Sequence, residues 1–301
     1  MRLWLTVFIV ILGALSASAC QSAGLGDLIE RRTPREQYVA ALRAAGLADT
    51  ALVRDWMAAA DAALREPQPA TLPLENEVRH DPARPRAFGY RFALRRGRVL
   101  RVELTVSETD PTAIFLELFN ATTSTAPVAI SKKNERRLEH EVEKDGDYIL
   151  RIQPELLRGG PLRIAQLTTA ALAFPVKGTT ASAVKSTFGV PRDGGRREHH
   201  GIDIFAPRDT PVLAAADGFV TWVGTNDLGG NVVWVWNPAR GQNHYYAHLS
   251  KQAVTTGQKV LAGEVVGYVG NSGNARTTPP HLHFGIYSRG EGPIDPLPFV
   301  R

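Results

Sequence analysis

The sequence of 301 residues contains a single cysteine, Cys20. An intramolecular disulfide and a thiolate zinc site are therefore both excluded, and any metal must be bound by histidine and carboxylate side chains. The sequence also lacks the Gly-x-Ser-x-Gly motif of a serine nucleophile and the His-Glu-x-x-His motif of a helical zinc site. A hydrolase built on this chain must therefore use another arrangement of residues.

The N-terminal apolar run, Leu3–Leu15, is too short to be counted on as a membrane span. It ends at Ala17-Ser18-Ala19-Cys20, which resembles a bacterial lipoprotein cleavage site, where the thiol is acylated. We expect residues 1–19 to be a signal peptide and Cys20 to be the lipid anchor. Gln21 is not the inner-membrane retention Asp, which favours the outer membrane with the protein facing the periplasm. Plain secretion into the periplasm is the alternative, because Ala-x-Ala is also a secretory pattern.

Charge is not concentrated in one stretch. The net charge is +5 and the sequence pI is about 9.5, while 44% of residues are hydrophobic and 22% are charged. This composition is that of a folded globular protein. The scattered arginines argue against nucleic acid as a partner, and the basic balance suits anionic envelope polymers or lipid headgroups.

Helix signals occur only near the N-terminus. Thr33-Pro34-Arg35-Glu36 combines an N-cap, a first-turn proline and a capping-box glutamate, and predicts a helix that ends at Gly46. A second helix is predicted over 49–66. We interpret the pair as a helical hairpin that carries no chemistry, within a lipid-anchored helical region and linker over 20–75. Residues 67–85 are read as a linker or an irregular strand.

From Phe88 onward the apolar residues alternate, and turn signals recur about every ten residues. This pattern predicts an antiparallel β-sandwich over 76–168. The stretch 145–154 resembles the end of the jelly-roll domains that precede many bacterial peptidases. His80 and His140 lack ligand-like neighbours and are expected at the surface.

Residues 169–301 are rich in glycine and β-branched residues and contain no long amphipathic pattern, so we predict an all-β domain. Its expected strands are Gly218–Val223, Val232–Trp236, Gln242–Tyr246, Val265–Val269 and His281–Tyr287. In the last of these, His281 and His283 share one face, because side chains alternate along a strand. One ring can bind a divalent metal while the other lies beside it for proton transfer.

An upstream cluster supplies further ligands. His199 and Asp203 are four residues apart in Glu198-His199-His200-Gly201-Ile202-Asp203, so in an extended segment they share a face, and Gly201 allows a bend. With one imidazole from His281 or His283 they make three protein ligands, the pattern of a catalytic zinc site. His200 has odd spacing and is expected to face away. A third motif, Tyr246-Ala247-His248-Leu249, brings His248 toward a cleft, and His244 is expected at the surface or behind the site.

These three motifs, in this order, resemble those of the lysostaphin/LytM-type zinc metallopeptidases over residues 170–301. Further matches are Phe188-Gly189, Thr210-Pro211-Val212 and Gly270-Asn271-Ser272-Gly273. The resemblance implies zinc ligands His199, Asp203 and His283, and a catalytic pair His248 and His281. Asp209 departs from the usual glycine, but we expect it in a turn away from the metal. The implied substrate is the stem peptides or cross-links of peptidoglycan.

The predicted fold is thus mainly β, with a helical hairpin, a jelly-roll-like sandwich and a C-terminal lysostaphin-type peptidase domain. Zinc would activate a water molecule, and His248 or His281 would act as the base, since the chain lacks a His-Glu-x-x-His glutamate. The alternative is a non-catalytic envelope regulator that binds peptidoglycan or activates another cell-wall hydrolase. Because regulators typically lose one or more of the five positions, their presence favours the enzyme. A lipoyl-like carrier is disfavoured, since no lysine occupies a hairpin tip with the expected acidic neighbour.

Overall fold

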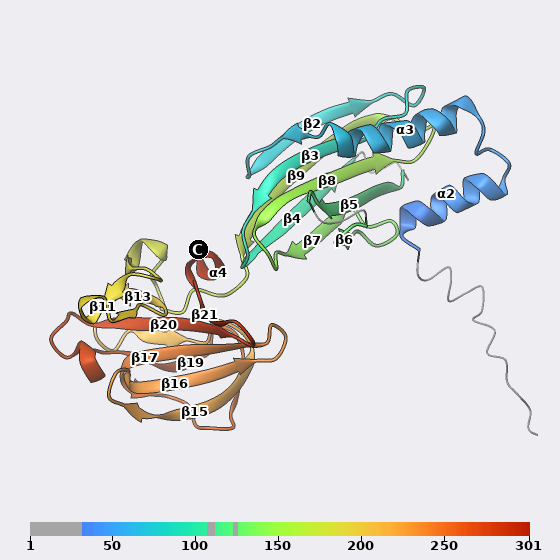
Figure 1. Ribbon diagram of the computed structural model, residues 1–301. Coiled ribbons are helices and arrows are strands. Elements are labelled where there is room, and N and C mark those ends of the chain that lie inside the picture. The colour runs from blue at the N-terminus through green and yellow to red at the C-terminus, as the bar shows by residue number, and fades with distance from the viewer. Residues whose placement is uncertain (1–31, 107–111, 123–125) are drawn as a thin grey trace, which may run out of the picture.

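The computed structural model describes residues 32–106, 112–122 and 126–301, so the predicted signal segment and Cys20 lie outside the described residues. The described chain is mainly β, with a sandwich and two helices toward the N-terminus and a second β unit toward the C-terminus (Figure 1). Among the described residues, no helix is long and apolar enough to cross a membrane.

The helices are α2 (Pro34–Ala44) and α3 (Ala51–Arg65). The capping box at Thr33 is present, because its side chain accepts from Glu36 N and the Glu36 side chain accepts from Thr33 N. Helix α3 lies so closely on the sandwich that a Cβ at Gly89 would come within 1.9 Å of Ala63 O. Trp56 Nε1 donates to Pro154 O at 2.8 Å, so the helices are packing elements of the sandwich.

Two sheets form the sandwich and enclose one hydrophobic core. The first sheet has the order β1-β3-β8-β5-β6 and the second β2-β9-β4-β7. All pairs are antiparallel except β1 with β3. The bounds are β1 (Gln68–Pro69), β2 (Leu74–His80), β3 (Phe88–Leu94), β4 (Arg98–Thr105), β5 (Ile114–Asn120), β6 (Ala129–Ile130), β7 (Arg137–Glu141), β8 (Gly146–Pro154) and β9 (Gly160–Ala170).

Two expectations for this region need correction. Residues 74–80, read as part of a linker or an irregular strand, form a regular strand, β2, whose alternate side chains Leu74, Asn76 and Val78 turn inward. Only two of those three are apolar, so the alternation is faint in the sequence. His80 is 5% exposed and therefore buried, contrary to its expected surface position, because its strand ends against β9.

The C-terminal unit is built on a sheet with the main order β10-β13-β20-β17-β16-β15-β18, to which β14, β19 and β21 add, and on a separate β11–β12 hairpin. The bounds are β10 (Val184–Ser186), β11 (Pro191–Arg192), β12 (Arg197–Glu198), β13 (Ile202–Phe205), β14 (Pro211–Leu213), β15 (Gly218–Asn226), β16 (Gly230–Asn237), β17 (Gln242–Gln252), β18 (Lys259–Val260), β19 (Val265–Val269), β20 (His281–Ser288) and β21 (Gly292–Ile294). A short helix, α4 (Leu297–Val300), follows.

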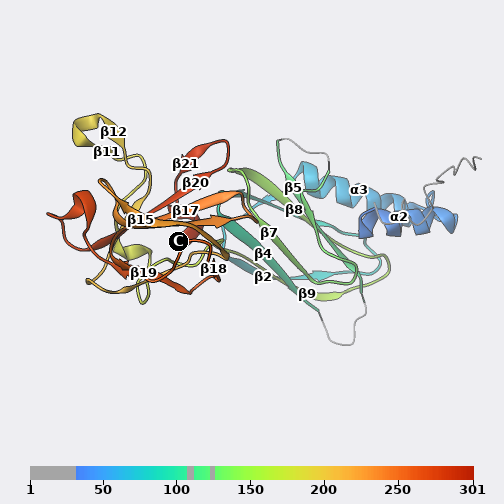
Figure 2. The same ribbon diagram turned by 90° about the horizontal axis from the view of Figure 1, so that it is seen from below.

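The five strands predicted for this unit are all present, and the long helices that the sequence excluded are absent from its described residues. The core lies on one side of the sheet and includes Val233, Val235, Tyr246 and Phe284. Seen from below, the unit and the sandwich meet end to end, with β20 and β21 near the junction (Figure 2). The face of β17 and β20 opposite the core is therefore the one left to carry a site.

Candidate metal centre and groove

The last predicted strand brings its histidines onto the sheet as expected. In β20, His283 is the direct antiparallel partner of Asp203 in β13, and His281 is the partner of Phe205. Directly opposed residues in such a pair have Cβ atoms about 5 Å apart. The cross-strand register thus places an imidazole against a carboxylate from a segment 80 residues upstream.

His199 reaches the same point through a bend. It precedes β13, and the chain turns at Gly201, where a Cβ would lie 2.5 Å from Phe284 O and 2.7 Å from the His283 ring. Glycine is therefore required there for close approach to β20. His199 Nε2 lies 3.0 Å from Asp203 Oδ1 and 3.0 Å from His283 Nδ1, and the latter two are 3.1 Å apart.

These three atoms form a donor set that fits a metal ion. His199 Nδ1 lies 2.8 Å from Thr187 O, and since a carbonyl only accepts, Nδ1 carries the proton and Nε2 is left with its lone pair. This lone pair lies beside a carboxylate oxygen and a second imidazole nitrogen. Together the three atoms carry more lone pairs than protons, as the ligands of a metal ion do. Among the described residues, His199, Asp203 and His283 are the group placed closely enough to hold a metal ion. Three protein ligands leave one coordination position open, and nitrogen and oxygen ligands without cysteine suit a hard or borderline metal ion.

A hairpin that the sequence did not single out supports the carboxylate. Arg192, at the end of β11, donates from Nη2 to Asp203 Oδ2 at 2.7 Å and to Ser186 Oγ at 2.6 Å. Asp203 Oδ1 remains directed at the two imidazoles. Burial alone would raise the pKa of Asp203, but the adjacent His199 and His283 rings hold that pKa well below its usual range. No sequence signal distinguishes Arg192 from the arginines beside it.

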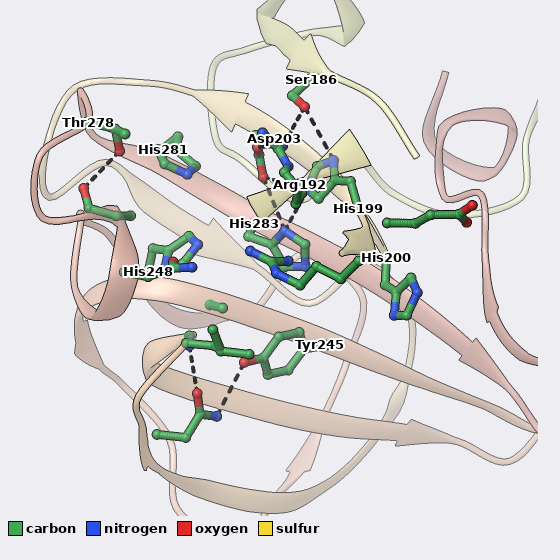
Figure 3. Close-up of a pocket in the computed structure, with 18 of the residues that line it drawn as sticks. Ser186, Arg192, His199, His200, Asp203, Tyr245, His248, Thr278, His281 and His283 are labelled. Carbon is green, nitrogen blue, oxygen red and sulfur yellow. Dashed lines mark hydrogen bonds and ion pairs between the residues drawn. The ribbon is translucent and has the colours of Figure 1, made fainter. Parts of the chain in front are cut away.

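His248 and His281 lie together beside the three ligands. Their ring centroids are 5.0 Å apart, and that of His248 is 5.9 Å from that of His283 (Figure 3). His248 Nδ1 donates to Ser272 O and His281 Nδ1 donates to Pro279 O, each at 2.9 Å. Each ring therefore keeps Nε2 as its free acceptor. Burial, with the neighbouring histidines, lowers the pKa of His248 to about 4.

The loop that positions His248 depends on close backbone packing. His248 has a φ of 61°, a strained value for a non-glycine residue, and such values cluster at functional sites. Its carbonyl partner Ser272 sits where Gly230 and Gly273 are packed back to back, each with a Cβ position 2.3 Å from the other's nitrogen. The Gly270–Gly273 motif is thus a support for His248.

All five predicted site residues line one open groove of about 900 Å³. Its walls also include Tyr245, Trp234 and Tyr287, and the loop 226–229. His200 is exposed and stacks on Phe188 with ring centroids 6.4 Å apart, outside the metal-ligating group, as expected. Asp209 has a φ of 66° in a turn and accepts from Ser250 Oγ, also as expected.

His244 does not occupy the surface or the groove. It is 0% exposed, packs beside Phe284 in the core and is one of the buried side chains without a hydrogen-bond partner among the described residues. The expectation of a surface position is wrong, because β17 shifts register between the partners of Asn231 and Val233. The shift reverses the alternation of side chains along β17, so His244 and His248, four residues apart, do not face the same side of the sheet.

Comparison with known proteins agrees with this geometry. Residues 197–296 match peptidase family M23. The L-Ala–D-Glu endopeptidase of Bacillus subtilis (strain 168) is 40% identical over 140 residues, 43% of this chain and 43% of that protein. The DD-carboxypeptidase/endopeptidase Mpg of Neisseria meningitidis serogroup B is 44% identical over 101 residues, 34% of this chain and 22% of that protein.

Among solved structures, the catalytic domain of the antimicrobial peptidase lysostaphin from Staphylococcus simulans aligns with a TM-score of 0.34 and 32% identity, covering 38% of this chain and 87% of that one. The chain spans less than half the length of the two curated relatives named above. The matched segment contains all five site residues, which are His199, Asp203, His248, His281 and His283. The C-terminal unit of this protein is a domain of peptidase family M23.

Proposed function

We propose that the protein is a zinc-dependent endopeptidase that hydrolyses stem peptides or cross-links of peptidoglycan. The observation that carries the proposal is the convergence of His199 Nε2, Asp203 Oδ1 and His283 Nδ1 within 3.1 Å of one another, beside His248 and His281 in one groove. The relatives named above are an L-Ala–D-Glu endopeptidase and a DD-carboxypeptidase/endopeptidase, which supports the substrate class.

His199, Asp203 and His283 would hold the zinc ion, and a bound zinc ion supplies Lewis-acid activation of water and of the scissile carbonyl. The chain's own residues then have distinct tasks. Arg192 and Thr187 O fix the orientation of Asp203 and His199 through the hydrogen bonds described above. The aromatic and apolar walls of the groove exclude water from around the substrate.

His248 and His281 would handle protons and negative charge. Each presents an unprotonated Nε2 to the groove while its Nδ1–H is held by a backbone carbonyl. One ring can accept the proton of the attacking water, and the other, once protonated, can donate to the developing oxyanion. Their centroid separation of 5.0 Å allows both to contact the same peptide bond.

The test uses the full-length protein with isolated peptidoglycan sacculi. We expect the zinc-loaded protein to release new amino termini, and mass spectrometry of the digest to identify the bond that is cut. His283→Ala should lose both hydrolysis and zinc, whereas His200→Ala, the adjacent exposed histidine, should retain zinc. Zinc binding by the wild type without any released amino termini would favour the non-catalytic regulator instead.

For the N-terminus, we propose that Cys20 carries lipid and anchors the protein to the outer membrane, facing the periplasm. The support is the Ala17-Ser18-Ala19-Cys20 sequence and the absence of any other cysteine. Radiolabelled palmitate should enter the wild type in the source bacterium and not Cys20→Ser. Equal labelling of both proteins, or labelling of neither, would overturn the anchor.

We further infer that the sandwich is jelly-roll-like and that α2 and α3 act as a helical hairpin between anchor and sandwich. The strand orders β2-β9-β4-β7 and β3-β8-β5-β6 support the first point. In each of these two sheets, strands from early in the sandwich pair with strands from late in it. The hydrogen bonds from Arg35 Nε to Gln153 Oε1 and from Gln153 Nε2 to Trp56 O support the second.

A further inference from the structure

A group of aromatic side chains covers the face of the sheet next to the groove, and its rings on β15 are exposed. We call it the aromatic field, and it consists of Phe219, Trp222, Trp234, Trp236, Tyr245 and Tyr287. Phe219 is 46% exposed and Trp222 is 41% exposed, whereas Trp234, Trp236 and Tyr287 are half-buried and Tyr245 is buried. Three of the five tryptophans in the sequence belong to it. Burying such rings is favourable, so a cluster left open to solvent indicates a contact surface.

The strand register shows that these rings share one face. Tyr245 pairs with Trp234, which pairs with Trp222, so one row crosses β17, β16 and β15. The next row runs from Tyr287 through Asn243 and Trp236 to Phe219. Strands β15, β16 and β17 lie side by side in that order (Figure 1). The opposite face carries Val220, Val233 and Val235, which fill the core.

The main core of the unit does not include the aromatic field, although Tyr245 forms a smaller buried cluster with Val232 and Ala247, against which Trp234 and Tyr287 pack. Only Trp234, Tyr245 and Tyr287 contact one another, with ring centroids 4.5 and 5.0 Å from Trp234. Trp222 lies over Gly224, where a Cβ would come within 2.5 Å of its ring. A glycine there lets the indole lie flat on the sheet with its face toward solvent.

The field is continuous with the groove. Trp234, Tyr245 and Tyr287 line the groove that also holds His283. His283 is the partner of Ala247, two residues along β17 from Tyr245. Two residues of strand span about 7 Å, so the first aromatic row lies one short step from the metal ligands. A substrate that reaches the metal can extend over the field.

The chemistry of the field suits sugar rings. Pyranose rings present flat faces of C–H groups that stack on aromatic rings, and polar edges that need hydrogen-bond partners. Asn243 supplies such a partner, because its amide lies between Trp236 and Tyr287 in the second row and makes no hydrogen bond to another described residue. An acetamido group can pair with that amide in both directions.

We propose that the aromatic field binds the glycan strand of the polymer whose peptides enter the groove, through stacking of N-acetylated sugar rings on Trp222, Trp234 and Trp236. The inference rests on the proposed function for the identity of the polymer. The rows carry no charged residue from β15 to β20, and the second row meets one lysine, Lys259, where it ends in β18. An anionic lipid surface is disfavoured as the occupant, since such surfaces are bound by clusters of lysine and arginine.

The first test measures binding of peptide-free N-acetylglucosamine pentasaccharide to the full-length protein, by tryptophan fluorescence and calorimetry. We expect saturable binding that is at least tenfold weaker in Trp222→Ala and in Trp236→Ala. Thr221→Ala, an exposed neighbour in β15 outside the rows, should bind as the wild type does. Retained binding in both tryptophan variants, or no binding by the wild type, overturns the proposal.

A second measurement separates this inference from the proposed function. For Trp222→Ala, the ratio of sacculus hydrolysis to hydrolysis of a soluble, sugar-free stem peptide should fall at least fivefold. Pentasaccharide binding without any hydrolysis would support the field and contradict the peptidase. Co-sedimentation with phosphatidylethanolamine–phosphatidylglycerol vesicles, lost in Trp222→Ala and unaccompanied by saccharide binding, would instead identify a membrane surface and overturn the glycan assignment.

Discussion

His244 shows how one buried residue couples stability to pH. Its ring lies in the core with neither nitrogen hydrogen-bonded among the described residues. Burial, assisted by the charge of Arg240, lowers its pKa to about 3. Because the folded-state pKa is depressed below the unfolded value near 6.5, the folded state is favoured above pH 6.5 and loses that advantage as the pH falls.

We therefore predict that the wild type loses about 2 kcal/mol of unfolding free energy between pH 7.5 and pH 5 through this residue alone. His244→Leu, which fills a similar apolar space, should remove most of that loss. Chemical denaturation at the two pH values checks this. An identical pH dependence in the variant and the wild type would show that His244 is not the group responsible.

At the scale of elements, the β11–β12 hairpin is the feature that completes the metal centre. Its strands pair only with each other, yet its Arg192 fixes the second oxygen of Asp203. Removing such a hydrogen bond behind a metal ligand typically costs 10–100-fold in affinity. The hairpin thus contributes to metal binding without supplying a ligand.

Arg192→Ala should weaken zinc affinity by about 10–100-fold, as measured by competition with a chromophoric chelator. Excess zinc should restore the lost hydrolysis, because the five site residues are unchanged. Arg196→Ala, on the same hairpin, is the control, since its Nε contacts only Asp193 O among the described groups. An unchanged zinc affinity in Arg192→Ala would contradict the assigned role.

The sequence predicted elements best where a local signal was strong. The capping box at Thr33 and the β-branched and aromatic residues of Gly218–Val223 or Val265–Val269 each specify an element within a few residues. Strand β2 was ambiguous because Asn76 occupies an inward position. Arg192 and the parity shift that buries His244 could not be predicted, since both depend on register between distant strands.

At the scale of the whole molecule, the sandwich and the M23 domain are joined by specific contacts. Arg240 forms two bonds to Glu141, at 2.6 and 2.7 Å, and Arg96 contacts Glu291 at 2.5 Å. Ala171 N donates to Gly97 O, and Phe299 fills the space that a Cβ at Gly97 would need. Sequence patterns predict the class of each unit, whereas these pairings arise only from tertiary packing.

The β11–β12 hairpin has a thermodynamic consequence beyond its geometry. Because one guanidinium ties this rim to the ion-binding carboxylate, displacement of the rim and release of the ion are linked equilibria. Any compound that wedges the hairpin away from the sheet must therefore lower the occupancy of the ion, and reciprocity requires the loaded protein to resist that compound more strongly than the ion-free protein.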